Sequence, residues 1–132
     1  MRAKELRIGN WVSFIDEHQN EEHHQITGIR QDLDNKVMLD VDEFYQWEDI
    51  DLFKPIPLTE EWLEKFGFET STWDDNSSYR MPLDDRGEFT LVFWRLDKTF
   101  EIGDVELCNI LYVHQLQNLY FALTSQELEL KE

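Results

Sequence analysis

The sequence has little of several features that other classes of protein depend on. It contains a single cysteine, Cys108, so no disulfide can form within the chain, which fits a reducing compartment. No apolar run approaches the length of a membrane span, and the first residues, MRAKELRIGNWV, lack the apolar centre of a secretion signal. We therefore expect a cytoplasmic protein that does not enter a membrane.

Basic residues are scarce as well. The chain has 12 Lys and Arg against 29 Asp and Glu, and its formal net charge is −17. A field of this sign repels phosphate backbones and anionic lipid headgroups, so direct binding to nucleic acid or to a membrane surface is disfavoured. The acidic residues lie in separate patches and form no acidic tail. Basic partners, cations and a purely solubilising role for the charge stay open.

Aromatic residues, by contrast, are abundant. Nine Phe, five Trp and four Tyr in 132 residues supply a packed interior that a disordered chain lacks. The length fits one ordinary domain or two small modules that share a core. We expect residues 1–57 to form a small all-β module and residues 58–132 to form an α+β module.

The first module is predicted from short runs of alternating polarity with no helix between them. These runs cover residues 6–15, 25–30, 36–41 and 44–53. Short strands at this spacing are typical of a curled sheet or an SH3-like small barrel. The predicted fold class is therefore α+β, with this sheet followed by a helix–antiparallel meander–helix unit.

The second module begins with the clearest local signal, PIPLTEEWLEKFGF, which predicts a helix over residues 60–66. Thr59 is the expected N-cap, because its hydroxyl can accept a hydrogen bond from a free N–H of the first turn. Gly67 fits the left-handed position that follows a helix. Antiparallel strands are expected within 68–107, and the one at 88–96 is expected near the centre of its sheet because it is apolar on both faces. The 3.6-residue period predicts a second helix over 110–123.

Three stretches of the chain together resemble one group of known proteins. They are LRIGNWV near the start, PIPLTEEWLEKFGF in the middle and YVHQLQNLYFALTSQEL near the end. The group consists of short uncharacterised proteins from gut bacteria, often encoded among prophage and mobile-element genes. The resemblance covers most of the chain and implies a bacterial, cytoplasmic or phage-related role. It implies no particular activity, substrate or catalytic residue.

The stretch HQNEEHHQ is the first candidate for chemistry. His18, His23 and His24 are candidate zinc ligands together with Glu21 or Glu22, because zinc accepts imidazole and carboxylate ligands. Adjacent residues of a strand point to opposite faces, however, so two neighbouring histidines cannot face one ion there. We interpret the stretch as a solvated hairpin loop, and we predict no metal site and no cofactor.

The second predicted helix has a polar face in a segment that carries no Asp, Glu, Lys or Arg. This face consists of His114, Gln115, Gln117 and Asn118. Because interface cores are poor in charged residues, we favour it as a surface that contacts a partner. A solvated face and a buried polar seam between the modules are the alternatives. Cys108 precedes this helix without a basic residue to favour its thiolate, so we expect a buried structural cysteine.

No motif of a known catalytic class is present, and no catalytic residue is predicted. The leading hypothesis is a non-catalytic protein-interaction or assembly module of a prophage or mobile element, with a protein partner or a second copy of the chain as its target. One alternative is an acidic mimic of nucleic acid that inhibits a DNA-binding protein. Another is a small metal-dependent hydrolase, which requires carboxylates and a histidine to converge in one pocket.

Overall fold

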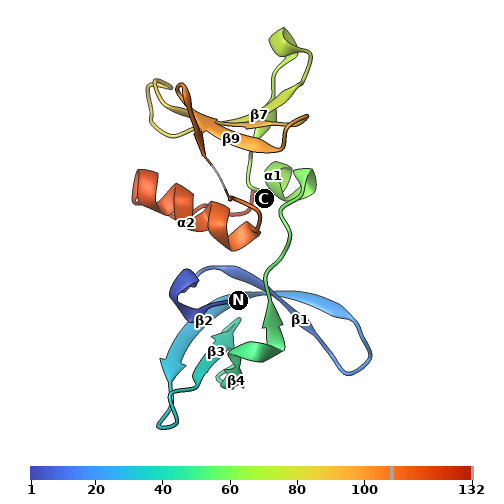
Figure 1. Cartoon of the computed structure of the whole chain (residues 1–132), viewed down its shortest axis with the longest axis vertical. Coiled ribbons are helices and arrows are strands. Elements are labelled where there is room, and N and C mark those ends of the chain that lie inside the picture. Colours follow the sequence, from blue (N-terminus) through green and yellow to red (C-terminus); the bar gives the residue numbers. More distant parts are fainter. Residues whose placement is uncertain (108, 132) are drawn as a thin grey trace. The chain divides into compact units, whose positions relative to one another are not determined.

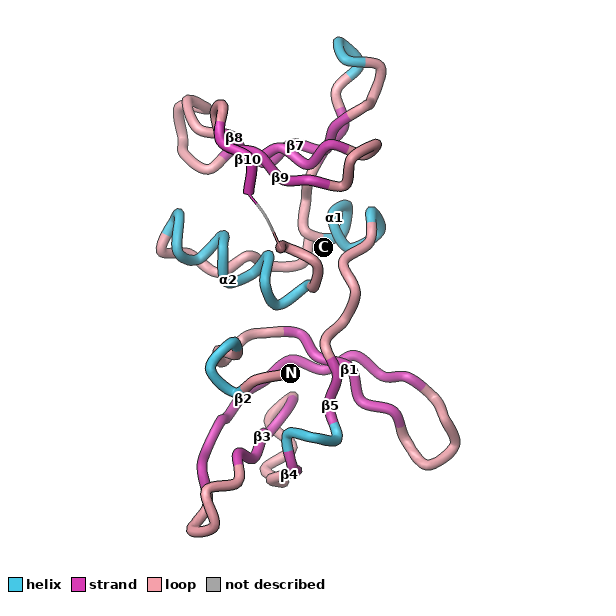
Figure 2. The backbone as a smooth tube through the Cα atoms, in the orientation of Figure 1, coloured by secondary structure: helices cyan, strands magenta, loops and turns pink. Residues whose placement is uncertain are grey.

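The computed structural model describes residues 1–107 and 109–131 (Figures 1 and 2). The protein is mixed α+β, and its described residues form mostly strands, which pair antiparallel, and two α-helices. Its residues group into two compact units. Unit 1 is Met1–Pro57 with Tyr112–Asn118, and unit 2 is Leu58–Leu111 with Leu119–Glu132. The expected structural role of Cys108 falls on a residue outside the described ranges.

Unit 1 is built on one curled sheet whose strands run in the order β4-β3-β2-β1-β5. All four strand pairs are antiparallel. Its elements are η1 (Ala3–Glu5), β1 (Trp11–Ile15), β2 (Glu21–Gln31), β3 (Val37–Val41), β4 (Glu48–Asp49), η2 (Ile50–Leu52) and β5 (Phe53–Lys54). Four of these strands, β1 to β4, are neighbours in the order in which they follow along the chain, and β5 returns to pair with β1 (Figure 2).

The sheet curls around a small apolar core. Side chains from every long strand contribute to it, and its buried members are Leu6, Val12, Ile26, Leu39, Val41 and Phe53. The pairing of β2 with β3 shifts between Ile26 and Gly28, and such an irregularity bends a strand. A Cβ atom at Gly28 would lie 2.8 Å from the ring of Trp47. A larger residue at this position would therefore displace the Trp47 ring of the β3–β4 loop.

Two expectations for this unit were wrong in detail. The strand predicted at 25–30 begins at Glu21, so most of the stretch expected to be a loop is paired with β1. The paired residues are polar on both faces, and polarity alone suggested a loop. The single strand expected over 44–53 is two short strands, β4 and β5, separated by the 3-10 turn η2.

Unit 2 contains a second five-stranded antiparallel sheet, in the order β10-β9-β8-β7-β6. Its elements are α1 (Glu60–Lys65), β6 (Glu69–Thr70), η3 (Thr72–Asp74), β7 (Ser78–Pro82), β8 (Thr90–Trp94), β9 (Thr99–Ile102) and β10 (Val105–Leu107). β8 was expected near the centre because it is apolar on both faces. It is the central strand, with Leu91, Val92 and Phe93 all buried.

Helix α1 forms where local signals predicted it. The Thr59 hydroxyl accepts a hydrogen bond from the Trp62 N–H at 3.4 Å. At the other end Gly67 has a φ of +96°, and its N–H donates to the Glu64 carbonyl at 3.0 Å. The Phe68 N–H donates to the Leu63 carbonyl, which completes the paired bonds of a Schellman motif. Local sequence is sufficient to define this helix.

Helix α2 (Val113–Thr124) begins three residues later than the expected start at 110. The chain before it is still extended, because Tyr112 pairs with Pro57 and the Val113 N–H donates to the Ile56 carbonyl at 2.9 Å. These contacts take backbone groups that an earlier helical turn would need. Within the described residues, no helix is long and apolar enough to cross a membrane.

Candidate functional site

The histidines of the stretch HQNEEHHQ lie in different surroundings. The His18 side chain is 77% exposed at the β1–β2 turn. His23 lies beside Glu21, and hydrogen bonds from Ser13 and His23 hold the pKa of the Glu21 carboxyl below its usual value. His24 is the next residue of β2, so its side chain lies on the opposite face of the sheet from that of His23 and has other neighbours. In the described part of the chain, no three His, Cys, Asp or Glu side chains are placed to hold a metal ion.

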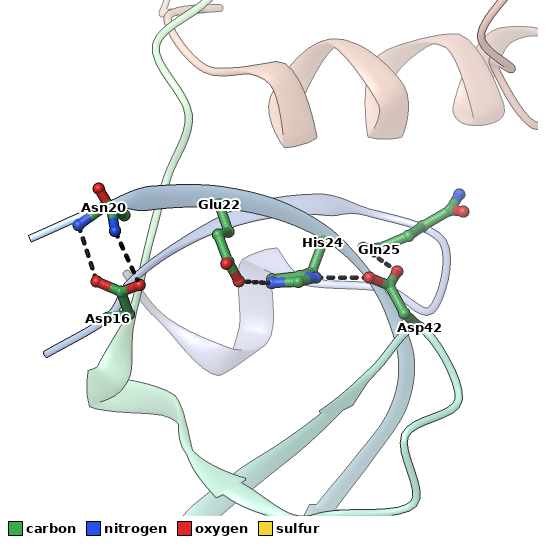
Figure 3. Close-up of polar contacts among 6 residues, drawn as sticks. All are labelled: Asp16, Asn20, Glu22, His24, Gln25 and Asp42. Carbon is green, nitrogen blue, oxygen red and sulfur yellow. Dashed lines mark hydrogen bonds and ion pairs between the residues drawn. The ribbon is translucent and has the colours of Figure 1, made fainter. Parts of the chain in front are cut away.

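The His24 ring lies between two carboxylates (Figure 3). Its Nδ1 is 2.5 Å from Oδ2 of Asp42, and its Nε2 is 3.1 Å from Oε2 of Glu22. The side chain is only 14% exposed, so the ring has little freedom to turn. A protonated ring donates to both carboxylates at once, whereas a neutral ring donates to one. The arrangement fixes the position of Glu22 on the surface of the sheet.

Asp42 and Asp16 also hold backbone groups in place, Asp42 beside this histidine and Asp16 at the β1–β2 turn (Figure 3). The second oxygen of Asp42 accepts a hydrogen bond from the Gln25 N–H at 2.9 Å. Asp16 closes the β1–β2 turn, since its Oδ1 accepts from the N–H of Asn20 at 2.8 Å. Carboxylates that flank the stretch in space therefore hold backbone groups at both of its ends, at Asn20 and at Gln25.

The β3–β4 loop beside His24 has an unusual backbone. Asp42, Glu43 and Tyr45 have φ angles of +50°, +58° and +58°, a region that side chains other than glycine seldom adopt. Two hydrogen bonds hold the loop. The Thr27 hydroxyl accepts from the Glu43 N–H at 3.0 Å, and the carboxylate of the buried Asp40 accepts from the Gln46 N–H at 3.2 Å. Backbone strain of this kind is concentrated at functional sites, which makes the loop a candidate binding element.

A pocket of about 170 Å³ lies against this loop on the surface of unit 1. Its lining combines apolar and aromatic side chains with polar ones. The lining residues are Phe14, Glu22, His24, Val41, Phe44, Gln46, Glu48 and Phe53. The rings of Phe14 and Phe53 contact each other at 5.6 Å between centroids, and the ring of Phe44 meets that of His24 edge to face at 5.8 Å. Three of the eight lining residues are therefore phenylalanines, and each has its ring in contact with another ring of the lining.

The charge of the pocket is one-sided. Two carboxylates, those of Glu22 and Glu48, line it, and no Lys or Arg does. The Glu22 carboxylate is engaged by His24, whereas the Glu48 carboxylate has no ion-pair or hydrogen-bond partner among the described residues. A carboxylate with a free charge beside aromatic rings can bind a cationic ligand, because both groups attract a positive charge.

The polar face of helix α2 makes contacts within unit 1. Gln117 is fully buried, its Oε1 accepts from the Trp11 N–H at 2.8 Å and its Nε2 donates to the Gly9 carbonyl at 2.9 Å. The Oδ1 of Asn118 accepts a hydrogen bond from the Asn10 side chain, and its Nδ2 donates one to the Glu5 carbonyl. Gln115 is half-buried, and its Oε1 accepts from the Tyr112 N–H at 3.1 Å.

His114 lies on the same face and is 1% exposed. Neither ring nitrogen has a hydrogen-bond partner among the described residues, and the ring stacks on that of Tyr112 at 5.9 Å. Burial holds the pKa of His114 below its ordinary value of 6.5. The Glu5 carboxylate, 3.6 Å from Nε2, partly opposes this shift, while the N-terminal amine adds to it. The folded protein therefore favours an uncharged His114.

We expect the free energy of unfolding to fall as the pH drops below 6.5. The unfolded chain takes up a proton on His114 near its ordinary pKa of 6.5, whereas the folded chain takes it up only at a lower pH. Protons thus favour the unfolded state in that window. The contribution of uncharged His114 to the free energy of unfolding is therefore fully present above pH 6.5. It is lost as the pH falls through the pKa that His114 has in the folded protein. Urea titrations at about pH 7.5 and about pH 5.5 measure the difference.

The control for this expectation is a pair of matched variants. His114→Phe removes the buried titrating group and is expected to flatten the pH dependence in that window. His18→Phe removes a histidine whose side chain is 77% exposed, and it should leave the pH dependence as it is in the original protein. An identical pH dependence in all three proteins would contradict a depressed pKa for His114.

No expectation from the sequence pointed to the pocket beside the β3–β4 loop. Of its lining residues, Glu22 and His24 were considered only as candidate ligands of a zinc site that was not predicted. The available signal was the run FYQW, three aromatic residues in an acidic loop, of which Phe44 is 59% and Tyr45 82% exposed.

Comparison with family models, with curated proteins and with solved structures finds no match to this chain.

Proposed function

We propose that the protein is a non-catalytic protein-interaction module that binds its partner through the pocket beside the β3–β4 loop. The observation that carries the proposal is the combination of exposed aromatic side chains with an ordered backbone. Phe44 is 59% exposed, yet its loop is held by hydrogen bonds to Thr27 and Asp40. Binding surfaces are enriched in aromatic residues, and a loop ordered before binding loses little entropy on association.

The fold of unit 1 is consistent with this role. We interpret its curled sheet as an SH3-like barrel, because a short strand after a 3-10 turn returns to pair with the first strand. Such a small scaffold serves many functions, so the argument depends on the pocket and not on the fold. The resemblance of three sequence stretches to proteins of prophage and mobile elements supports a cytoplasmic bacterial setting, with either a protein partner or a second copy of the chain as the target.

The test is a selection of peptides from a displayed random library on the purified protein. We expect the selected peptides to bind the original protein and to lose at least about tenfold in affinity for Phe44→Ala, since burial of one aromatic anchor commonly contributes that much. Phe89→Ala is the matched control, because Phe89 is also 59% exposed but lies in unit 2.

Two outcomes would contradict the proposal. One is a selection that yields no binder. The other is a set of binders that lose affinity equally for Phe44→Ala and Phe89→Ala, or for neither. Native mass spectrometry of the same protein tells the two kinds of target apart, since a second copy of the chain would appear as a dimer that Phe44→Ala weakens.

A further inference from the structure

The dimensions of the pocket limit what can occupy it. Pockets for drug-sized ligands usually enclose about 300–1,000 Å³. The pocket beside the β3–β4 loop encloses about 170 Å³, which is room for one long side chain and not for a cofactor. Its occupant, within the proposed function, is therefore a single anchoring side chain of the partner.

The lining determines the charge of that side chain. Phe14, Phe53 and Val41 supply apolar contact for an aliphatic stem, while the carboxylates of Glu22 and Glu48 lie among the lining residues. An acidic side chain would be repelled by both carboxylates. An uncharged apolar one would bury the unpaired Glu48 carboxylate without a partner, and this is costly. A cationic side chain satisfies the carboxylate and uses the apolar floor.

Among cationic side chains, arginine fits this lining better than lysine. The planar guanidinium stacks on aromatic rings and can also donate two parallel hydrogen bonds to one carboxylate. Glu48 has both oxygens free for such a pair, and the ring of Phe44 is 59% exposed. An ammonium group makes a point contact and is more strongly hydrated, so it gains less from entering an aromatic pocket.

The charge of the whole chain favours the same partner. With a formal net charge of −17, the protein attracts basic segments and repels acidic ones before contact. His24, fixed between Glu22 and Asp42, keeps the Glu22 carboxylate beside the pocket (Figure 3). We propose that the pocket beside the β3–β4 loop binds an arginine side chain from a basic segment of the partner protein. This inference rests on the proposed function and specifies its chemistry.

Three short peptides test the inference directly. They are acetyl-Gly-Arg-Gly-amide, the same peptide with lysine, and the same peptide with citrulline, which has the shape of arginine without its charge. Titration into isotopically labelled protein, followed by NMR, gives each affinity and the residues that respond. We expect the arginine peptide to shift signals of the pocket-lining residues and to bind at least about tenfold more tightly than the citrulline peptide. The lysine peptide should bind with intermediate affinity.

The matched variants are Glu48→Gln and Glu17→Gln. Both remove one negative charge, but Glu48 lines the pocket and Glu17 is exposed outside it. We expect Glu48→Gln to lower the affinity for the arginine peptide about tenfold and Glu17→Gln to change this affinity less than twofold. Equal weakening by both variants would show a general attraction to the acidic surface and would overturn the inference. Binding of the citrulline peptide as tightly as the arginine peptide would also overturn it.

The peptide selection distinguishes failure of this inference from failure of the proposed function. If the selected peptides depend on Phe44 but contain no arginine in common, the interaction role stands and the arginine assignment is wrong. If nothing binds in either experiment, both are wrong. A shared arginine whose change to citrulline abolishes binding supports both.

Discussion

Gln117→Leu is expected to lower the free energy of unfolding by about 2 kcal/mol, because it removes two buried hydrogen bonds to the start of the chain. The side-chain amide of Gln117 accepts from the Trp11 N–H and donates to the Gly9 carbonyl, and the residue is fully buried. Leucine is close to glutamine in size but can replace neither bond. The Gly9 carbonyl keeps its second donor, Gln25, so most of the loss comes from the Trp11 bond.

Gln31→Leu is the matched control, because Gln31 is exposed at the end of β2 and makes only long contacts of 3.3 and 3.5 Å with Asn35. We expect it to change the free energy of unfolding by less than about 0.5 kcal/mol. Both values come from urea titrations followed by circular dichroism. If the two variants are equally stable, Gln117 does not join helix α2 to the start of the chain.

Phe100→Ala is expected to have the largest effect of any substitution considered, a loss of about 3–5 kcal/mol. Phe100 on β9 is 1% exposed and is among the largest fully buried side chains. Its ring packs against that of Phe93 on β8 at 4.9 Å between centroids. Truncation to alanine removes this contact and leaves a cavity that neighbouring residues of a sheet, held by their backbone pairing, fill only in part.

The same substitution at an exposed phenylalanine provides the comparison. Phe89→Ala removes a ring that is 59% exposed, and it should lower the free energy of unfolding by less than about 1 kcal/mol. Thermal and urea unfolding of both variants measure the difference. Similar losses for Phe89→Ala and Phe100→Ala would contradict the placement of Phe100 in the core of unit 2.

These two predictions rest on features of different origin. Phe100 lies within residues 68–107, where the sequence predicted antiparallel strands. The burial of Gln117 was only one of the alternatives left open by the sequence, because glutamine is mostly exposed in proteins and this one lies on the polar face of an amphipathic helix. Only contacts with residues more than 100 positions earlier in the chain make that face an interior one.

The polar face of helix α2 is an interior face for the same reason. The helix face of His114, Gln115, Gln117 and Asn118 was favoured from its lack of charge. The structure buries two of these side chains and engages three in hydrogen bonds within unit 1. We propose instead the pocket beside the β3–β4 loop, where Phe44 is 59% exposed and the Glu48 carboxylate has no partner among the described residues.

Features that depend only on neighbouring residues could be predicted before the structure was known. Helix α1 is one example, because Thr59 and Gly67 complete hydrogen bonds within a few residues of themselves. The α+β class and the central strand β8 also follow from local periodicity. The tertiary structure alone decided where β2 begins, what the polar face of α2 contacts and which side chains form the pocket. Each of these depends on strand register and on long-range pairing, and no local pattern of residues specifies which distant segment will supply the partner.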